Sequence, residues 1–323
     1  MSAATIATRA LAPYAAGNRN TGNLYEIVFA LTALRRMGLS DTDWDALSPL
    51  FATIRTYNYK FTDAVATAVR TATPPGTGLT LDGHAVTDIR NVTQDDADGG
   101  TGDFVFVLAN GTERSISVEE GAPQRTGAIH KCLSNPTCRR LGATPAMVDE
   151  FKAIAAAAVD EFKAEMTGRY GADPAAWPAR TKSTAQNRAV AAVATRTADH
   201  FNSLDAATRA AHLRDLLRSD GTGTGASPAD YLALVKKDTW TVKLWSWGDL
   251  RINPADYVLR RKGDYVEFTH ETTGHVIGKT QIKFNNGVYK RQADGTWKTS
   301  SLTSSWNGGF CLTDCFALTP VAL

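Results

Sequence analysis

The sequence predicts an α+β (mixed α/β) protein with a β-rich C-terminal region. An amphipathic helical pattern occupies 23–37, strand-like segments follow between 79 and 120, and helical patterns return between 144 and 219. After 229, short runs of aromatic and β-branched residues again favour strands. Helices and strands therefore come in blocks and do not alternate as in a regular βαβ array.

The first block begins with one strong helix. Apolar residues recur within 23–37 at the spacing of a buried helix face, and Gly38 predicts where the helix ends. These apolar residues are Leu24, Ile27, Val28, Leu31 and Leu34. A weaker helical pattern covers about 41–70, with an interruption near 57–59, and the Pro/Gly-rich stretch at 71–78 predicts a loop.

The strand-like segments lie at about 79–94, 103–109 and 113–120. The dipeptide Asn110-Gly111 separates the last two, and this pair of residues is a strong signal for a hairpin turn. We therefore expect residues 103–120 to form a β-hairpin.

This hairpin carries acidic residues at one end. A two-residue turn would place Asp103 opposite Val118, whereas a three-residue turn through Thr112 would place it opposite Glu119. A one-residue slip moves every side chain to the other face, so the pattern leaves both registers open. In either register Asp103, Glu119 and Glu120 come to the same end of the hairpin.

The second helical block contains three predicted helices. A long one is expected over 144–168, with Thr144 as its cap and a proline in its first turn. Two more are expected over 181–201 and 203–219, the latter capped by Ser203.

Composition divides the chain into three regions: 1–218, a Gly/Thr/Ser-rich linker at 219–228, and 229–323. Five of the seven tryptophans follow the linker, which marks the third region as different. Its expected strands lie in the segments "TWTVKLWSW", "DYVEFTHE", "HVIGKTQIKFNN" and "FCLTDCFAL".

Composition and charge set limits on function. The 323 residues are 43% hydrophobic and 21% charged, which argues against wholesale disorder, and the net charge of +2 neither favours nor excludes a polyanionic partner. We find no secretory signal and no apolar run of membrane-spanning length, so we expect a cytoplasmic protein and leave a place in a virion open. The cysteines, spaced C-x5-C and C-x3-C, favour reduced thiols over a zinc site.

Two or three carboxylates around Mg²⁺ can activate water and neutralise a phosphodiester transition state, whereas acidic strand ends can also serve solubility alone. The order of a helix with Glu26, a strand led by Asp103, a hairpin, a second strand and a following helix resembles the PD-(D/E)XK restriction-endonuclease core. The resemblance covers roughly residues 20–165. It implies a central sheet flanked by helices, Mg²⁺ as cofactor and hydrolysis of DNA.

Matched position by position, Asp103 corresponds to the metal-binding Asp of the family, and the next pair falls on Ser117 and Glu119. Glu119 stands where the family usually has its catalytic Lys. The resemblance thus implies Asp103, Ser117 and Glu119 as catalytic residues, and Asp103, Glu119 and Glu26 as metal ligands. A helix cap is the other explanation of Glu26, because Asn23 precedes it by three residues.

Basic residues predict contacts with double-stranded DNA. Lys131, Arg139 and Arg140 follow the acidic hairpin, where they would contact phosphates. The region from 236 to 298 mixes Lys and Arg with Trp, and its segment "TQIKFNNG" resembles the last strand of some restriction enzymes. The expected DNA contacts there are Lys283, Asn285 and Asn286.

Two functions fit these patterns. The first is a Mg²⁺-dependent DNA endonuclease of type II character, or a degenerate relative that only binds DNA. The second is a non-enzymatic structural or DNA-binding protein of a phage or virus particle. The order of elements and the basic loop favour the first, while Glu119 in the lysine position favours the second. A homodimer stays open, and we expect no membrane partner.

Overall fold

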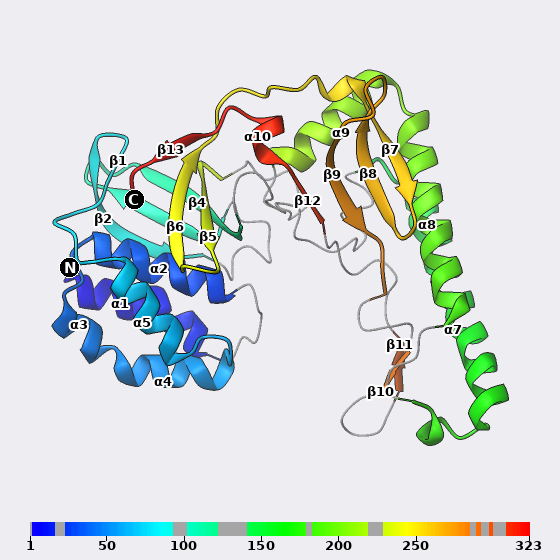
Figure 1. Ribbon diagram of the computed structural model, residues 1–323, viewed down its shortest axis with the longest axis horizontal. Coiled ribbons are helices and arrows are strands. Elements are labelled where there is room, and N and C mark those ends of the chain that lie inside the picture. Colours follow the sequence, from blue (N-terminus) through cyan, green and yellow to red (C-terminus); the bar gives the residue numbers. More distant parts are fainter. Residues whose placement is uncertain are drawn as a thin grey trace. The chain divides into compact units, whose positions relative to one another are not determined.

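A computed structural model describes residues 2–16, 23–92, 102–121, 141–178, 183–218, 229–284, 289–291, 297–299 and 308–323. It is a mixed α+β protein, as predicted (Figure 1). The chain forms two compact units. Unit 1 holds Met1–Gly127, Gly225–Arg251 and Cys311–Leu323, and unit 2 holds Ala128–Thr224 and Ile252–Phe310.

One boundary between the two units, from Thr224 to Gly225, falls within the expected linker. The first strands after residue 228 join the sheet of unit 1, so the expected third region, 229–323, is divided between the two units. The expected linker, 219–228, lies outside the described residues.

The helices of unit 1 come mainly from the first 72 residues. They are α1 (Ala3–Leu11), a 3-10 turn η1 (Ala12–Ala15), α2 (Asn23–Arg36), α3 (Asp41–Ala46), α4 (Ser48–Tyr57) and α5 (Asp63–Ala72). The predicted helix over 23–37 is confirmed as α2. The weaker pattern over 41–70 is three helices, because a proline opens α4 and Thr62 caps α5 by accepting a hydrogen bond from the Val65 N–H.

The sheet of unit 1 has seven strands in the order β1-β2-β3-β4-β5-β6-β13. Their bounds are β1 (Thr80–Leu81), β2 (His84–Asn91), β3 (Phe104–Leu108), β4 (Glu113–Glu120), β5 (Tyr231–Lys236), β6 (Thr241–Ser246) and β13 (Thr319–Val321). All neighbours are antiparallel except β4 and β5. A parallel pair requires a long crossover, and here the chain between β4 and β5 includes all three long helices of unit 2.

One face of this sheet holds the core of unit 1. Phe104 and Phe106 of β3 and Ile116 and Val118 of β4 are buried. Helix α2 packs on this face, with the Phe29 ring centroid 5.2 Å from that of Phe104 and 5.7 Å from that of Phe106 (Figure 1). The alternation of strand side chains sends the intervening residues to the other face.

Unit 2 combines three long helices with a smaller sheet. Its helices are α7 (Pro145–Tyr170), η3 (Pro174–Ala176), α8 (Thr184–Ser203), α9 (Ala206–Arg218) and η4 (Pro254–Asp256). The Thr144 cap on α7 is confirmed, since its hydroxyl accepts from the Met147 N–H. Ser203 was the wrong cap for α9: the Asp205 carboxylate accepts from the Thr208 N–H, because α8 extends through Ser203.

The antiparallel sheet of unit 2 has the order β12-β9-β8-β7. It consists of β7 (Tyr257–Lys262), β8 (Tyr265–His270), β9 (Val276–Gln281) and β12 (Gly308–Phe310), and a separate hairpin pairs β10 (Tyr289–Arg291) with β11 (Trp297–Thr299). The segment "FCLTDCFAL" was expected to be a strand. Only its first residue ends β12, and α10 (Leu312–Cys315) follows.

One face of the unit 2 sheet packs on α8. The Phe268 ring lies 6.4 Å from that of Phe201 on α8 and 5.0 Å from that of Phe310. At the edge of the sheet, the Asn202 side chain donates to the Leu259 carbonyl at 2.8 Å and accepts from the Leu259 N–H at 2.9 Å. Asn202 therefore satisfies both backbone groups of Leu259 on the outer strand β7.

None of the helices that the structure describes is long and apolar enough to cross a membrane.

Candidate functional site

The predicted hairpin is present, with a loop of three residues, Ala109 to Gly111. The Leu108 N–H donates to the Thr112 carbonyl at 2.8 Å, and the Asn110 side chain accepts from the Thr112 N–H at 3.0 Å. Gly111 closes the loop with φ of +81°, a conformation that glycine adopts without strain.

This loop sets a register that differs from both expected ones. Phe104 pairs with Ile116, so continuing the ladder by one residue places Asp103 opposite Ser117. The expectation failed because the loop begins at Ala109, one residue before the Asn-Gly pair, and this shifts the pairing.

In the observed register, Asp103 at the start of β3 lies on the same face of the sheet as Ser117 and Glu119 of β4. This face is opposite the core face, to which Ile116 and Val118 belong. Asp103 and Glu119 are diagonal neighbours on the two strands, and long side chains at such positions can reach one another. A separation of roughly 4–6 Å between their carboxylates stays a prediction.

Asp103 also has a role in the fold. Its Oδ2 accepts a hydrogen bond of 2.7 Å from the Val118 N–H, at the point where the ladder between β3 and β4 ends. The chain leaves the ladder at Gly102, which has φ of +150° and lies so close to β4 that a Cβ there would be 2.8 Å from the Ile116 carbonyl oxygen. The Asp103 carboxylate thus replaces a backbone acceptor.

Glu26 lies in the first turn of α2, the helix on the opposite, core face of the sheet. It is 7% exposed and accepts a 2.9 Å hydrogen bond from the Tyr14 hydroxyl. Its neighbour Tyr25 donates to Glu120 of β4, and burial and this carboxylate together raise the pKa of Tyr25. The structure therefore gives Glu26 and Glu120 tyrosine partners that the sequence pattern did not indicate.

Lys243 is a cation on the same face as Glu119 that sequence reasoning missed. Glu119 pairs with Leu234 of β5, and Leu234 pairs with Lys243 of β6. The usual strand spacing separates the Cα atoms of Glu119 and Lys243 by about 10 Å, within reach of two extended side chains. Lys243 is exposed. Its position follows from the parallel pairing of β4 with β5, which no local pattern predicts.

Most of the residues predicted to contact DNA lie outside the described residues. These are Lys131, Arg139, Arg140, Asn285 and Asn286. Lys283 is described: it follows β9 and is partly exposed between the buried Ile282 and Phe284.

Within the described part of the chain, no group of three or more His, Cys, Asp and Glu side chains is arranged to hold a metal ion. Cys311 and Cys315 are free thiols, and burial raises the pKa of Cys315 to about 12, so this thiol stays protonated. Asp103 and Glu119 remain a two-carboxylate set, and Mg²⁺ is commonly held by one or two carboxylates together with phosphate oxygens and water.

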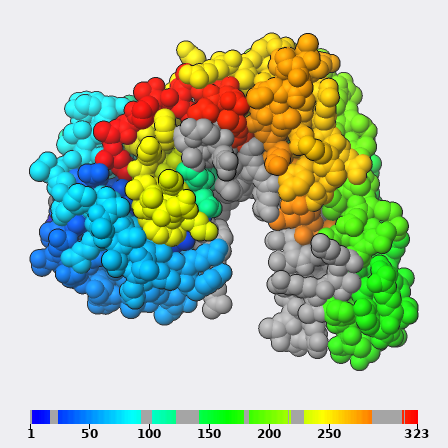
Figure 2. Space-filling view, in the orientation of Figure 1, coloured from blue at the N-terminus to red at the C-terminus, as the bar shows by residue number. Residues whose placement is uncertain are grey.

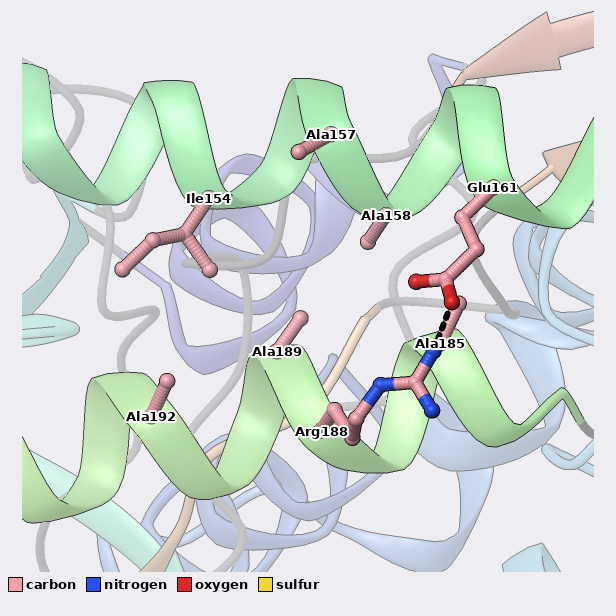
Figure 3. A pocket seen from close by; sticks show the side chains of 8 residues that line it. All are labelled: Ile154, Ala157, Ala158, Glu161, Ala185, Arg188, Ala189 and Ala192. Carbon is pink, nitrogen blue, oxygen red and sulfur yellow. Dashed lines mark ion pairs between the residues drawn. The ribbon is translucent and has the colours of Figure 1, made fainter.

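Unit 2 contains a shallow groove between α7 and α8 (Figure 3). Alanines line most of it, and the ion pair of Glu161 with Arg188 lies at one end. Small side chains allow two helices to approach closely, so helix packing explains this groove.

Comparisons with protein-family models, curated proteins and solved structures find no match to this chain.

Proposed function

We propose that this chain is a DNA-binding protein that resembles Mg²⁺-dependent type II restriction endonucleases and, if active, hydrolyses phosphodiester bonds. The observation that carries the proposal is that Asp103 and Glu119 share one sheet face at one end of β3 and β4. That end includes the carboxyl ends of the parallel strands β4 and β5, and ligands of open mixed sheets commonly bind at such ends.

The arrangement of unit 1 supports a restriction-endonuclease-like core. Helix α2, the strand that follows Asp103, the hairpin loop and β4 come in the order that the resemblance implies, whereas the helix that should follow, α7, belongs to unit 2. The sheet continues beyond β4 with the parallel strand β5, and α2 covers one of its faces. We therefore propose that unit 1 holds the nuclease-like core.

The donor set fits a hard cation, because carboxylate oxygens are the ligands that Mg²⁺ prefers. Asp103 and Glu119 would hold it, and a bound Mg²⁺ would supply charge neutralisation at phosphate and activation of water. Ser117, opposite Asp103, would hydrogen-bond within the same site. Lys243 would offset phosphate charge from the same sheet face, where Glu119 replaces the usual Lys. Glu26 is not required in this arrangement, since it comes from the helix on the core face.

The test is cleavage of plasmid and duplex DNA in Mg²⁺ or Mn²⁺, with variants that separate charge from structure. Asp103→Asn keeps an acceptor for the Val118 N–H and removes the charge, and Glu119→Gln does the same at the second ligand. Both should abolish cutting. Glu120→Gln is the matched control, because Glu120 is adjacent but belongs to the core face with Tyr25. Equal activity in all four proteins would refute the proposed site.

A non-enzymatic structural or DNA-binding protein, for example of a phage or virus particle, is the second candidate. Two observations favour it: Glu119 occupies the lysine position, and the Asp103 carboxylate serves the β4 backbone. Glu119→Lys restores a compact cation in the position usual for the family. If wild type, Asp103→Asn and Glu119→Lys all bind DNA and none cuts it under any metal condition, this candidate stands and the enzyme is refuted.

A further inference from the structure

The unit 2 sheet has a second face, opposite α8, that carries basic side chains. The register places Arg260 of β7, Glu267 of β8 and Lys279 of β9 in one row across the sheet. The next row is formed by Lys262, Tyr265 and Gln281. By alternation, both rows point away from the face of Leu259 and Phe268, which packs on the helix. We call these two rows the outer face.

The outer face is accessible and dominated by cations. Arg260, Lys262 and Lys279 are all exposed, and Figure 2 shows that segment 257–281, coloured from yellow to orange, reaches the molecular surface. Glu267 is the carboxylate within these two rows, and its oxygen lies 3.6 Å from the Lys262 Nζ. A second carboxylate, that of Asp264, lies at the margin of this face and accepts a hydrogen bond from the Gln281 side chain. Three cations therefore stand against Glu267 within the rows and Asp264 at their margin.

Lys283 extends this pattern beyond the end of β9. The Ile282 N–H still bonds to the Asp264 carbonyl at 2.8 Å, so the alternation continues past the strand. Ile282 and Phe284 are buried on the helix side, which turns Lys283 toward the side of Lys279. The DNA contact expected at Lys283 thus falls beside the outer face.

We propose that the outer face binds the phosphate backbone of duplex DNA through Arg260, Lys262 and Lys279. Neighbouring positions on one face of a strand are about 7 Å apart and alternate strands about 10 Å apart, so the three cations can neutralise phosphates within a single helical turn of about 34 Å. The proposal rests on the proposed DNA-binding function and adds a surface distinct from the acidic site of unit 1.

Tyr265 favours phosphate contact over base stacking. The Lys279 Nζ lies over its ring, 5.2 Å from the centroid, so a base would have to displace this cation to stack there. The occupant that fits the outer face is therefore a phosphate backbone, and duplex DNA presents one without unstacking its bases.

The strands also provide a matched control. Arg261 lies between Arg260 and Lys262 on β7, is equally exposed, but belongs to the opposite side, and its Nε donates to the Gly263 carbonyl at 3.0 Å. Neutralising Arg261 removes the same charge from the same strand without touching the outer face.

The experiment measures fluorescence anisotropy of a labelled duplex with the full chain between 50 and 200 mM salt. Each lost phosphate contact should reduce the slope of log affinity against log salt concentration by about 0.9. The triple variant Arg260→Gln/Lys262→Gln/Lys279→Gln should therefore have a slope about 2–3 smaller in magnitude than that of wild type. Arg261→Gln should keep most of that slope. Glu267→Gln should tighten binding several-fold, an effect that no loss of structure would produce. Thermal unfolding should show that all variants remain folded.

The outcomes separate the two proposals. If wild type fails to bind any duplex at 50 mM salt, both DNA binding and this surface are refuted. If wild type binds and the triple variant matches Arg261→Gln, the outer face is refuted and DNA binding stands. If single-stranded DNA binds more tightly than the duplex and Tyr265→Leu abolishes that binding, the face is a stacking surface and the duplex assignment is wrong.

Discussion

The sheets of the two units are built differently, yet a side chain completes the backbone hydrogen bonding in each. In unit 1 the central pairing joins β4 to β5 across more than a hundred residues, and Asp103 satisfies the Val118 N–H where the ladder ends. In unit 2 the strands β7, β8 and β9 pair as a meander, to which β12 adds, and Asn202 satisfies both backbone groups of Leu259 at the edge.

The comparison teaches which polar residues serve the fold. The carboxylates in and around the acidic hairpin of unit 1 have structural partners: the Val118 N–H for Asp103, Tyr14 for Glu26 and Tyr25 for Glu120. The outer-face cations of unit 2 are exposed, and the partners of two of them, Glu267 for Lys262 and Tyr265 for Lys279, lie on the same face. Mutations should therefore affect stability mainly in the first group and DNA affinity mainly in the second.

The largest stability effect is expected at Arg35, a charge that is 2% exposed in unit 1. Its guanidinium donates to the carbonyls of Thr73 and Leu39 at 3.0 and 2.9 Å and pairs with Asp41 at 3.0 Å. Arg35→Ala leaves these buried carbonyls without a donor, so it should lower the free energy of unfolding by about 3–5 kcal/mol. Urea unfolding followed by hydrogen exchange should show the loss in unit 1, with α7 and α8 of unit 2 unaffected.

Arg70→Ala is the control for Arg35. Arg70 pairs with the same Asp41, at 3.0 Å, but its side chain is 33% exposed. Solvent screens such a pair, and its loss should cost no more than about 1 kcal/mol. Equal losses in the two variants would show that burial does not decide the effect.

The next effect is expected at the unit 2 edge. Asn202→Ala removes both hydrogen bonds to Leu259 and should destabilise unit 2 by about 2–3 kcal/mol. Asn202→Asp keeps the acceptor for the Leu259 N–H but places a second carboxylate oxygen against the Leu259 carbonyl, so it should cost at least as much as Asn202→Ala. Amide exchange at Leu259 measures this, and unchanged protection in both variants would contradict the role given to Asn202.

Asp103 should show a smaller effect, because its carboxylate accepts a hydrogen bond from one backbone group, the Val118 N–H. Asp103→Ala should destabilise unit 1 by about 1–2 kcal/mol, whereas Asp103→Asn, which keeps the acceptor, should cost much less. Thermal unfolding of both variants gives the comparison. If Asp103→Asn lowers stability as much as Asp103→Ala, the negative charge of Asp103, and not its geometry, holds the end of the ladder.

The sequence predicted the elements better than their pairing. The helices over 23–37 and 144–168 follow from apolar spacing, Thr144 and Pro145, all of which are local signals. The hairpin also followed from its Asn-Gly pair, but its register did not, because a three-residue loop begins at Ala109.

The candidate site was predictable in part for the same reason. Asp103 and Glu119 share a face because they belong to one hairpin, whose two strands are close in sequence. Lys243 reaches that face through two further pairings, one of them the parallel contact of β4 with β5. Such a crossover depends on tertiary packing and leaves no trace in local periodicity, and the tyrosine partners of Glu26 and Glu120 depend on how α2 packs on the sheet.

The smallest effect is expected at Asp82, a partly exposed carboxylate between β1 and β2 with φ of +53°. Two hydrogen bonds hold the pKa of Asp82 below its usual value. The one from the Tyr231 hydroxyl has the larger effect, and the one from the Arg114 Nε, at 2.7 Å, has the next largest. The stabilisation is therefore present above the unfolded carboxyl pKa of about 3.9 and is lost as pH falls through the lower folded value.

Asp82→Asn keeps the left-handed backbone and an acceptor for Tyr231 but removes this titration. The difference in unfolding free energy between wild type and Asp82→Asn should stay under about 1 kcal/mol, because the Asp82 side chain is 34% exposed. This difference should be constant from about pH 5 to 9 and should shrink below about pH 4. Urea unfolding across this range measures it. A difference that does not change with pH would mean that the ion pair with Arg114 contributes nothing to unit 1.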